Sequence, residues 1–211
     1  MPRSQHRPVI HEEETRNTIL RTAQQLFMEH GYRAVSTRQI ADGCGLTQPA
    51  LYHHFSDKQD LYVAVMQESL AETQAALERI LRRNESVQER LKRIARYLLS
   101  NTERNHAMMM HDIQQELSVT SRTVLNKAFQ AGIITPIRSL LEEGIQQGVL
   151  LDAQKSGIDP TTATYLFMSM LSQFLQHSDG IKRDVLEKER AEEVIVQLLF
   201  HGIATAHSDH S

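Results

Sequence analysis

The stretch from Gly45 to Phe55, GLTQPALYHHF, joins small polar residues to aromatic and imidazole side chains within one predicted short helix. Thr47 is suited to cap this helix, and Pro49 falls in its first turn, where a missing N–H is harmless. A helix that enters the DNA major groove needs small residues at its start, because its backbone approaches base edges and phosphates closely. The stretch therefore predicts a DNA-reading helix, and its candidate DNA-facing residues are Thr47, Gln48, Pro49, Ala50, Tyr52 and His53.

Each candidate side chain has a possible role at DNA and an alternative reading without one. Gln48 can make paired hydrogen bonds to adenine, and Thr47 can reach a phosphate. Lys58 lies in the first turn of the following helix, where free amides also favour a phosphate. The alternatives are that Tyr52 is a half-buried core residue, that His53 is a surface residue without a role, and that capping alone accounts for Thr47.

Other kinds of site find little support in the sequence. Cys44 is the one cysteine, so the chain can form neither an internal disulfide nor a multi-thiol metal site. His106 and His111 are five residues apart, not the four of a helical metal-binding pair, and no metal site is expected. The sequence has no P-loop, G-x-G-x-x-G or G-x-S-x-G motif. We therefore expect no cofactor and no enzymatic activity.

The elements that must position the DNA-reading helix are two further helices before it. Apolar residues recur at helical spacing over about 12–30, and Gly31 supplies a stop. Ser36 and Gln39 can form a capping box that opens a short helix over about 37–43. Helices separated by a glycine-containing turn of three or four residues are typical of a helix-turn-helix.

The flanks of this unit are a mobile arm and a long helix. Residues 1–11 contain prolines and arginines without periodicity, which predicts the arm. Residues 56–59, Ser-Asp-Lys-Gln, form a second predicted capping box, which opens a long helix of about 57–83.

Composition predicts an all-α protein. Aromatic residues make up 5% of the 211 residues, Trp is absent, and there are only nine Gly and five Pro. The net charge is −3, and residues 1–60 contain seven Lys or Arg and seven Asp or Glu. Bulk charge alone would thus not suggest a nucleic-acid partner. The chain shows no signal peptide and no membrane-spanning stretch, so we expect a cytoplasmic protein without a membrane partner.

Two late segments carry broad apolar stripes with the same helical offsets, starting from Ala163 and from Ala191. Either both stripes pack on the chain's own core, or they pair with a second copy as a four-helix bundle. The second reading predicts a homodimer with an interface that contains Phe167, Met170, Leu171, Phe174, Val194, Leu198 and Leu199.

The region of about 84–180 contains methionine and phenylalanine residues that suit the lining of an apolar pocket. The alternative for each is an ordinary core position. Pro136 would lose its bond to the carbonyl of Gly132, so a kink is expected between them. Kinked helices often leave space for a ligand, and the candidate effector-binding residues are Arg104, Met109, His111, Phe129, Phe167 and Met168.

Residues 16–65 resemble the DNA-binding domain of TetR-type (TetR/AcrR) transcriptional regulators. The matching pattern is R-x-x-I-L-x-x-A-x-x-L-F-x-x-x-G-Y followed by S-T-R-Q-I-A-x-x-x-G-L-T-x-x-A-L-Y-x-H-F-x-x-K-x-x-L-x-x-x-V. The resemblance implies an all-helical homodimer with an N-terminal three-helix DNA-binding head and a C-terminal domain that binds an effector and dimerises. It also implies that Ser36, Thr37 and Arg38 lie at the DNA surface together with the candidates above.

The resulting expectation is a flexible arm over 1–11, a helix-turn-helix DNA-binding domain over 12–58, and an effector-binding and dimerisation domain over 59–211. The expected function is a repressor that binds a palindromic double-stranded DNA operator and is released by a small apolar or amphipathic effector of unknown identity. One alternative is an architectural DNA-binding protein with a TetR-like head and no effector. A further alternative is an activator, because the sign of regulation depends on where the operator lies.

Overall fold

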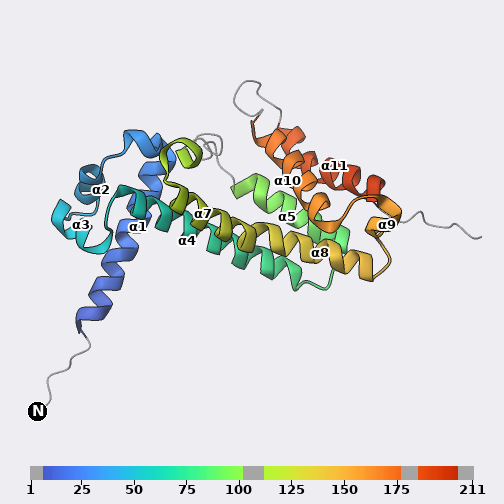
Figure 1. Ribbon diagram of the computed structural model, residues 1–211, viewed down its shortest axis with the longest axis horizontal. Coiled ribbons are helices and arrows are strands. Elements are labelled where there is room, and N and C mark those ends of the chain that lie inside the picture. Colours follow the sequence, from blue (N-terminus) through green and yellow to red (C-terminus); the bar gives the residue numbers. More distant parts are fainter. Residues whose placement is uncertain (1–6, 102–111, 177–184, 204–211) are drawn as a thin grey trace, which may run out of the picture. The chain divides into compact units, whose positions relative to one another are not determined.

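The computed structural model describes residues 7–101, 112–176 and 185–203, and these residues form helices joined by short turns, with no β-strand (Figure 1). The predicted all-α class is confirmed. The helices are α1 (Arg7–Ala34), α2 (Thr37–Gly43), α3 (Gln48–His54), α4 (Lys58–Leu81), α5 (Val87–Asn101), α7 (Val119–Phe129), the π-helix η1 (Gln130–Ile134), α8 (Thr135–Gln146), α9 (Ala153–Ser156), α10 (Pro160–Gln176) and α11 (Val185–Ile203). Residues 112–116 are also helical. None of the described helices has a stretch long and apolar enough to cross a bilayer.

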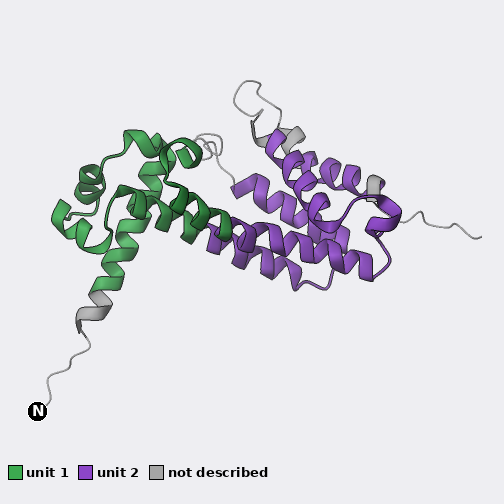
Figure 2. Cartoon of the chain, viewed as in Figure 1, with its two compact units in different colours: residues 1–69, 107–127 green, residues 70–106, 128–211 purple. Residues whose placement is uncertain are grey.

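The chain divides into two compact units (Figure 2). Unit 1 contains residues 1–69 and 107–127, and unit 2 contains residues 70–106 and 128–211. Helix α4 contributes residues to both units, since the division falls after Ser69. The functional division between residues 58 and 59 stays a prediction, because the compact units are defined by packing.

Helix α1 begins at Arg7, earlier than the predicted start near residue 12. The second residue of the helix is Pro8, and its missing N–H is one of the amides that have no partner inside the first turn of a helix. The predicted stop at Gly31 is a kink: Gly31 has φ 81° and ψ 164°, a conformation that glycine adopts without steric cost, and helical residues continue to Ala34.

Local hydrogen bonds at the start of α2 confirm one predicted capping box. The Ser36 hydroxyl accepts from the Gln39 amide at 3.2 Å, and the Gln39 side chain accepts from the Ser36 amide at 2.8 Å.

The prediction of a second capping box from Ser56 to Gln59 is wrong by one residue, since Asp57 caps the helix in place of Ser56. Asp57 accepts from the Asp60 amide at 2.7 Å, and the Asp60 carboxylate accepts from the Ser56 amide at 3.0 Å. A carboxylate gains more than a hydroxyl from the positive end of a helix, which explains the choice of Asp57 as the cap.

The core of unit 1 holds the short helices in place. Ile19 of α1, Ile40 of α2, Leu51 of α3 and Leu61 of α4 are all fully buried. A cluster of Phe27, Tyr32 and Tyr62 closes one end of this core, with ring centroids 5.0–6.0 Å apart.

The core of unit 2 is built from α5, α8, α10 and α11. Three of the residues predicted at a dimer interface, Phe167, Leu171 and Leu199, lie in this core with 0–5% exposure. Met170 and Phe174 are half-buried against it. Only Val194 and Leu198 are exposed, at 43% and 61%. The apolar stripes are thus explained in large part by the chain's own packing.

The predicted kink between Gly132 and Pro136 takes the form of the π-helix η1. The amide of Thr135 donates to the carbonyl of Gln130, five residues back, so the helix is wider just before Pro136. A Cβ atom at Gly132 would lie 3.0 Å from the carbonyl oxygen of Leu70, so the close approach of the two backbones requires glycine.

Candidate nucleic-acid interface

The turn between α2 and α3 has the geometry that a helix-turn-helix needs. Gly45 has φ 66°, a left-handed conformation that suits glycine, and its amide donates to the Asp42 carbonyl at 3.1 Å. The Leu46 amide donates to the Ala41 carbonyl at 2.8 Å. These bonds end α2 and set the direction in which α3 starts.

Helix α3 has one buried face and one exposed face. Leu51 is fully buried and Phe55, just after the helix, is 3% exposed, so both anchor α3 to the core of unit 1. The Thr47 hydroxyl accepts from the Ala50 amide at 3.4 Å and confirms the predicted cap. Ala50 is half-buried, Tyr52 is 46% exposed, and the remaining predicted DNA-facing residues, Thr47, Gln48, Pro49 and His53, are exposed.

Thr37 supports two side chains of this exposed face. It is 8% exposed, and its hydroxyl accepts from the Gln48 side-chain amide at 3.1 Å. The same hydroxyl lies 3.1 Å from the Tyr52 hydroxyl. The family resemblance places Thr37 at the DNA surface, but here its hydroxyl is engaged by the side chains of Gln48 and Tyr52.

Two other residues near the start of α2 differ in how free they are. The amide and hydroxyl of Ser36 both donate to the Gln39 side chain, so Ser36 is engaged in capping. The side chain of Arg38 is 80% exposed, and its ion pair with Asp42 is long at 3.9 Å. A pair this exposed contributes little, and Arg38 is able to turn toward a phosphate.

Lys58 is held more closely than its predicted role suggests. Its ammonium lies 4.3 Å from the centre of the Tyr32 ring, in cation–π geometry. Partial burial lowers the pKa of Lys58, and partial burial also raises the pKa of Tyr32. The contact with Tyr32 thus gives Lys58 a packing role beside the predicted one at phosphate.

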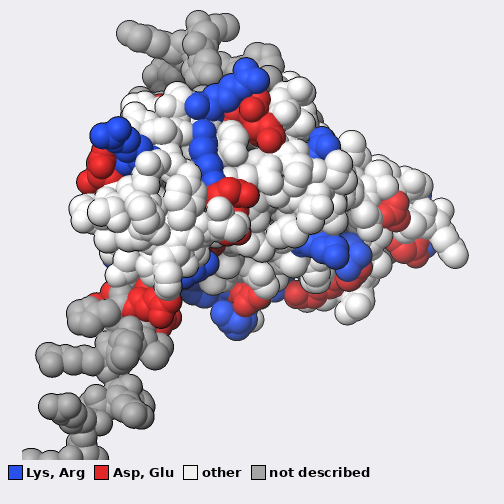
Figure 3. All heavy atoms as spheres, turned by 60° about the vertical axis from the view of Figure 1, so that its left-hand side comes forward, with Lys and Arg blue, Asp and Glu red and all other residues white. Residues whose placement is uncertain are grey.

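The candidate DNA surface is not distinguished by a concentration of basic side chains. Over the face shown in Figure 3, basic side chains lie beside acidic ones and form no continuous basic patch among the described residues. This agrees with the balanced count of charges in residues 1–60. Recognition would therefore depend on the placement of individual side chains more than on a general attraction to phosphate.

Comparisons with known proteins agree with this geometry. A family model for bacterial regulatory proteins of the tetR family matches residues 19–65. The HTH-type transcriptional repressor AcnR of Corynebacterium efficiens is 30% identical over 142 residues, which cover 67% of each chain. The chain belongs to the TetR family.

Two further relatives show how far the likeness extends. This chain is 35% identical over 80 residues to the HTH-type transcriptional activator FasR of Mycolicibacterium smegmatis, but the match spans only 36% of FasR. The crystal structure of AibR, in complex with isovaleryl coenzyme A and operator DNA, has a TM-score of 0.66 at 24% identity, with 88% of this chain and 98% of AibR covered. At this identity the second likeness shows the shared fold.

A segment far along the sequence packs on the DNA-binding head. Asp112 is 5% exposed, and its carboxylate accepts from the Tyr32 amide at 2.9 Å. The amide of Ser118 donates to the Gln59 side chain at 2.9 Å, which draws Gln59 away from the predicted capping box. Sequence reasoning missed these contacts, because eighty positions separate Tyr32 from Asp112 and no local pattern links them.

The predicted effector-binding residues fall into two groups. Arg104, Met109 and His111 lie outside the described residues. Phe167 is fully buried, and Phe129 and Met168 are half-buried against the same core of unit 2. The structure thus brings the three apolar candidates to one core and shows an ordinary packing role for each.

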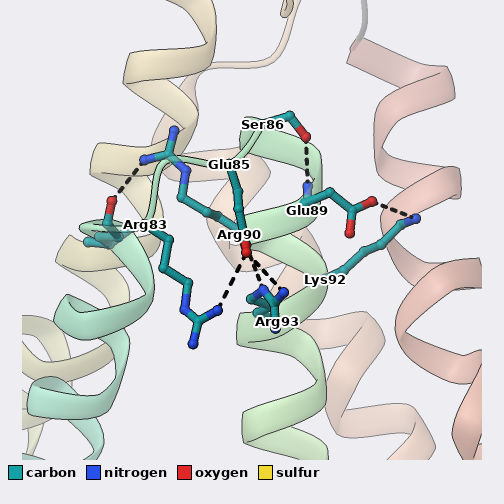
Figure 4. Close-up of polar contacts among 8 residues, drawn as sticks. Arg83, Glu85, Ser86, Glu89, Arg90, Lys92 and Arg93 are labelled. Carbon is teal, nitrogen blue, oxygen red and sulfur yellow. Dashed lines mark hydrogen bonds and ion pairs between the residues drawn. The ribbon is translucent and has the colours of Figure 1, made fainter.

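The end of α4 is joined to α5 and α8 within unit 2 by a charged network, part of which Figure 4 shows. The guanidinium of Arg90 is 7% exposed; it donates to the Leu81 carbonyl at 2.9 Å and to the Glu143 carboxylate at 3.0 Å. These hydrogen bonds from Arg90 lower the pKa of Glu143. Further ion pairs surround the turn before α5. Glu85 pairs with both Arg83 and Arg93. Glu89 pairs with Lys92, and the Glu89 amide donates to the Ser86 hydroxyl.

Proposed function

We propose that this TetR-family chain is a repressor that binds a palindromic operator as a homodimer and is released by a small apolar or amphipathic effector. The observation that carries the proposal is the exposed face of α3, where Thr37 orients Gln48 and Tyr52 above the buried anchor Leu51. Side chains fixed in this way can read base edges in a major groove. Ser36, Arg38, Thr47, Pro49, Ala50, His53 and Lys58 complete the proposed DNA surface.

The proposed dimer rests on the exposed sides of α10 and α11. Tyr165 and Leu166 on α10 are 44% and 45% exposed, and Val194 and Leu198 on α11 are similarly open. Exposed large apolar residues on two neighbouring helices suit pairing with the same helices of a second copy, as in a four-helix bundle. The two DNA-binding heads would then need a separation of about 34 Å to reach adjacent major grooves.

The proposed effector class follows from the composition of unit 2. Phe129 and Met168 lie half-buried beside Phe167, and Met adapts to irregular ligands. The π-helix η1 follows Phe129 directly, and such segments are frequent at functional sites. The solved structure of AibR contains isovaleryl coenzyme A, an amphipathic molecule of the class we propose here.

We propose repression over activation. Of the two relatives, AcnR is a repressor and FasR is an activator. We favour repression because the AcnR match extends over the larger part of the chain.

Selection of bound duplexes from a random-sequence pool at physiological salt tests the DNA proposal, with purified full-length protein and no ligand. Enrichment of an inverted repeat supports a symmetric, sequence-reading dimer. Salt-sensitive retention without enrichment would instead favour an architectural DNA-binding protein.

Release of the selected duplex by acyl coenzyme A thioesters of increasing chain length then tests the effector proposal. Fluorescence anisotropy should fall as the thioester is added, whereas free coenzyme A should leave the complex intact. If both the thioesters and a wider panel of apolar compounds leave the complex intact, the effector part of the proposal is wrong.

A further inference from the structure

Three side chains from two helices of unit 1 meet beside the proposed DNA surface. Glu12 of α1 and the neighbouring residues His53 and His54 of α3 each offer one ligand atom, and these atoms all lie within 4.8 Å of one another. Glu12 and His53 are exposed and His54 is half-buried. No function in the proposed regulator requires this grouping, because the proposed contact of His53 with DNA would need neither Glu12 nor His54.

The helices that carry these side chains are fixed against each other. Leu51 of α3 and Phe55, the residue after the helix, are buried in the core of unit 1. Arg16, one helical turn after Glu12 on α1, places its guanidinium 5.2 Å from the centre of the Phe55 ring. The backbones that carry Glu12, His53 and His54 are therefore held near one another, and only the side chains need to move.

The donor set suits a divalent transition metal. Imidazole nitrogen and carboxylate oxygen bind Zn²⁺ at about 2.0–2.2 Å, and three such ligands with one water complete a tetrahedral site. Adjacent donors of that tetrahedron are about 3.4 Å apart. The present spacing of at most 4.8 Å comes within this range by small rotations of exposed side chains.

We propose that Glu12, His53 and His54 form a binding site for a divalent transition metal ion, with Zn²⁺ as the reference ion. The ion would cross-link the first described turns of α1 to the last turn of α3. It would also neutralise the carboxylate of Glu12 and add positive charge beside His53, which strengthens attraction to phosphate.

Metal binding by the full-length chain tests this proposal independently of DNA. Zn²⁺ competition against a chromophoric chelator should give one tight site per chain, and Co²⁺ should give the visible absorption of a tetrahedral complex. Glu12→Gln, His53→Ala and His54→Ala should each weaken Zn²⁺ binding at least about tenfold, since even the loss of a supporting outer ligand has that effect.

The control variant is His201→Ala, because His201 is exposed on α11 in unit 2, away from the three ligands in the sequence. It should leave the affinity of the tight site unchanged. Circular dichroism of each variant checks that the helices are intact. The proposal is overturned if Glu12→Gln binds Zn²⁺ as tightly as the unmodified chain, or if His201→Ala reduces binding as much as the α3 variants do.

Discussion

Single side chains at the DNA-binding head differ in whether they would touch DNA or hold another residue in place. Thr37 belongs to the second kind, because its buried hydroxyl contacts both Gln48 and Tyr52. The family resemblance implies that Thr37 belongs to the interface, but it does not separate contact from support. That distinction depends on a hydrogen bond between helices, which local spacing does not encode.

Thr37→Val should weaken operator binding about fivefold to 150-fold. The substitution keeps the shape of the side chain and removes its hydroxyl, and two hydrogen bonds of about 0.5–1.5 kcal/mol each would be lost. Anisotropy with the selected operator measures the effect. Thr123→Val is the control, since Thr123 is exposed on α7 in the same unit. Equal affinity for Thr37→Val and the unmodified chain would show that Gln48 and Tyr52 need no support.

Lys58→Ala distinguishes a phosphate contact from a packing role. If Lys58 leaves Tyr32 to bind a phosphate, the variant should bind all duplexes more weakly, and the slope of log affinity against log salt should flatten by about one unit. Lys127→Ala is a matched control, because Lys127 is an exposed lysine of unit 1. An unchanged slope, together with a loss of about 0.5–2 kcal/mol in the free energy of unfolding, would assign Lys58 to the Tyr32 ring alone.

At the scale of helices, the sequence predicts best what is local. The start of α2, the cap of α3 and the kink before α8 each depend on residues within about one turn, and each is present. The start of α4 is displaced because Gln59 binds Ser118, far along the chain. The grouping of Glu12 with His53 and His54 escaped prediction for the same reason, since it depends on how α1 packs against α3.

Glu143→Gln tests the network that joins α4, α5 and α8. Since Arg90 lowers the pKa of Glu143 in the folded chain, this pair contributes stability at neutral pH and loses it as pH falls through the folded-state pKa. The variant should lose about 1 kcal/mol of unfolding free energy at pH 7, a modest value because Glu143 is partly exposed.

Urea unfolding at several pH values measures the Glu143 effect. The difference between the variant and the unmodified chain should shrink as pH drops below about 4, where free carboxylates become protonated. Glu142→Gln, at a more exposed neighbouring position, serves as the control. A difference that stays constant with pH would rule out the ion pair as its cause.

Across the whole molecule, apolar residues either pack in the core or lie on the surface, where they can contact a partner. The sequence stripes on α10 and α11 could not separate the two, because a helix that packs on its own core and a helix that pairs with a copy have the same periodicity. The exposed fraction of each side chain distinguishes core residues from residues open to a partner. Leu171 is 1% exposed, whereas Leu198 is 61% exposed.

Leu198→Glu should therefore convert the proposed dimer to monomers while the melting temperature of unit 2 changes little. Leu171→Glu should unfold unit 2 instead, because it buries a charge in the core. Sedimentation equilibrium and thermal unfolding measure the two effects. Val119→Glu is the control, since Val119 is 69% exposed on α7. A dimer that survives Leu198→Glu would place the interface on another surface.

The single cysteine lies in the turn after α2, at a position suited to a spectroscopic label. Cys44 is half-buried at the end of α2, and its thiol lies 3.9 Å from the Thr18 carbonyl, a weak contact that leaves it available. In the proposed homodimer, spin labelling of this thiol would attach one probe to each DNA-binding head without any engineered residue. Pulsed dipolar spectroscopy between the two probes would then record, in one preparation, how the spacing of the heads responds to operator and to effector.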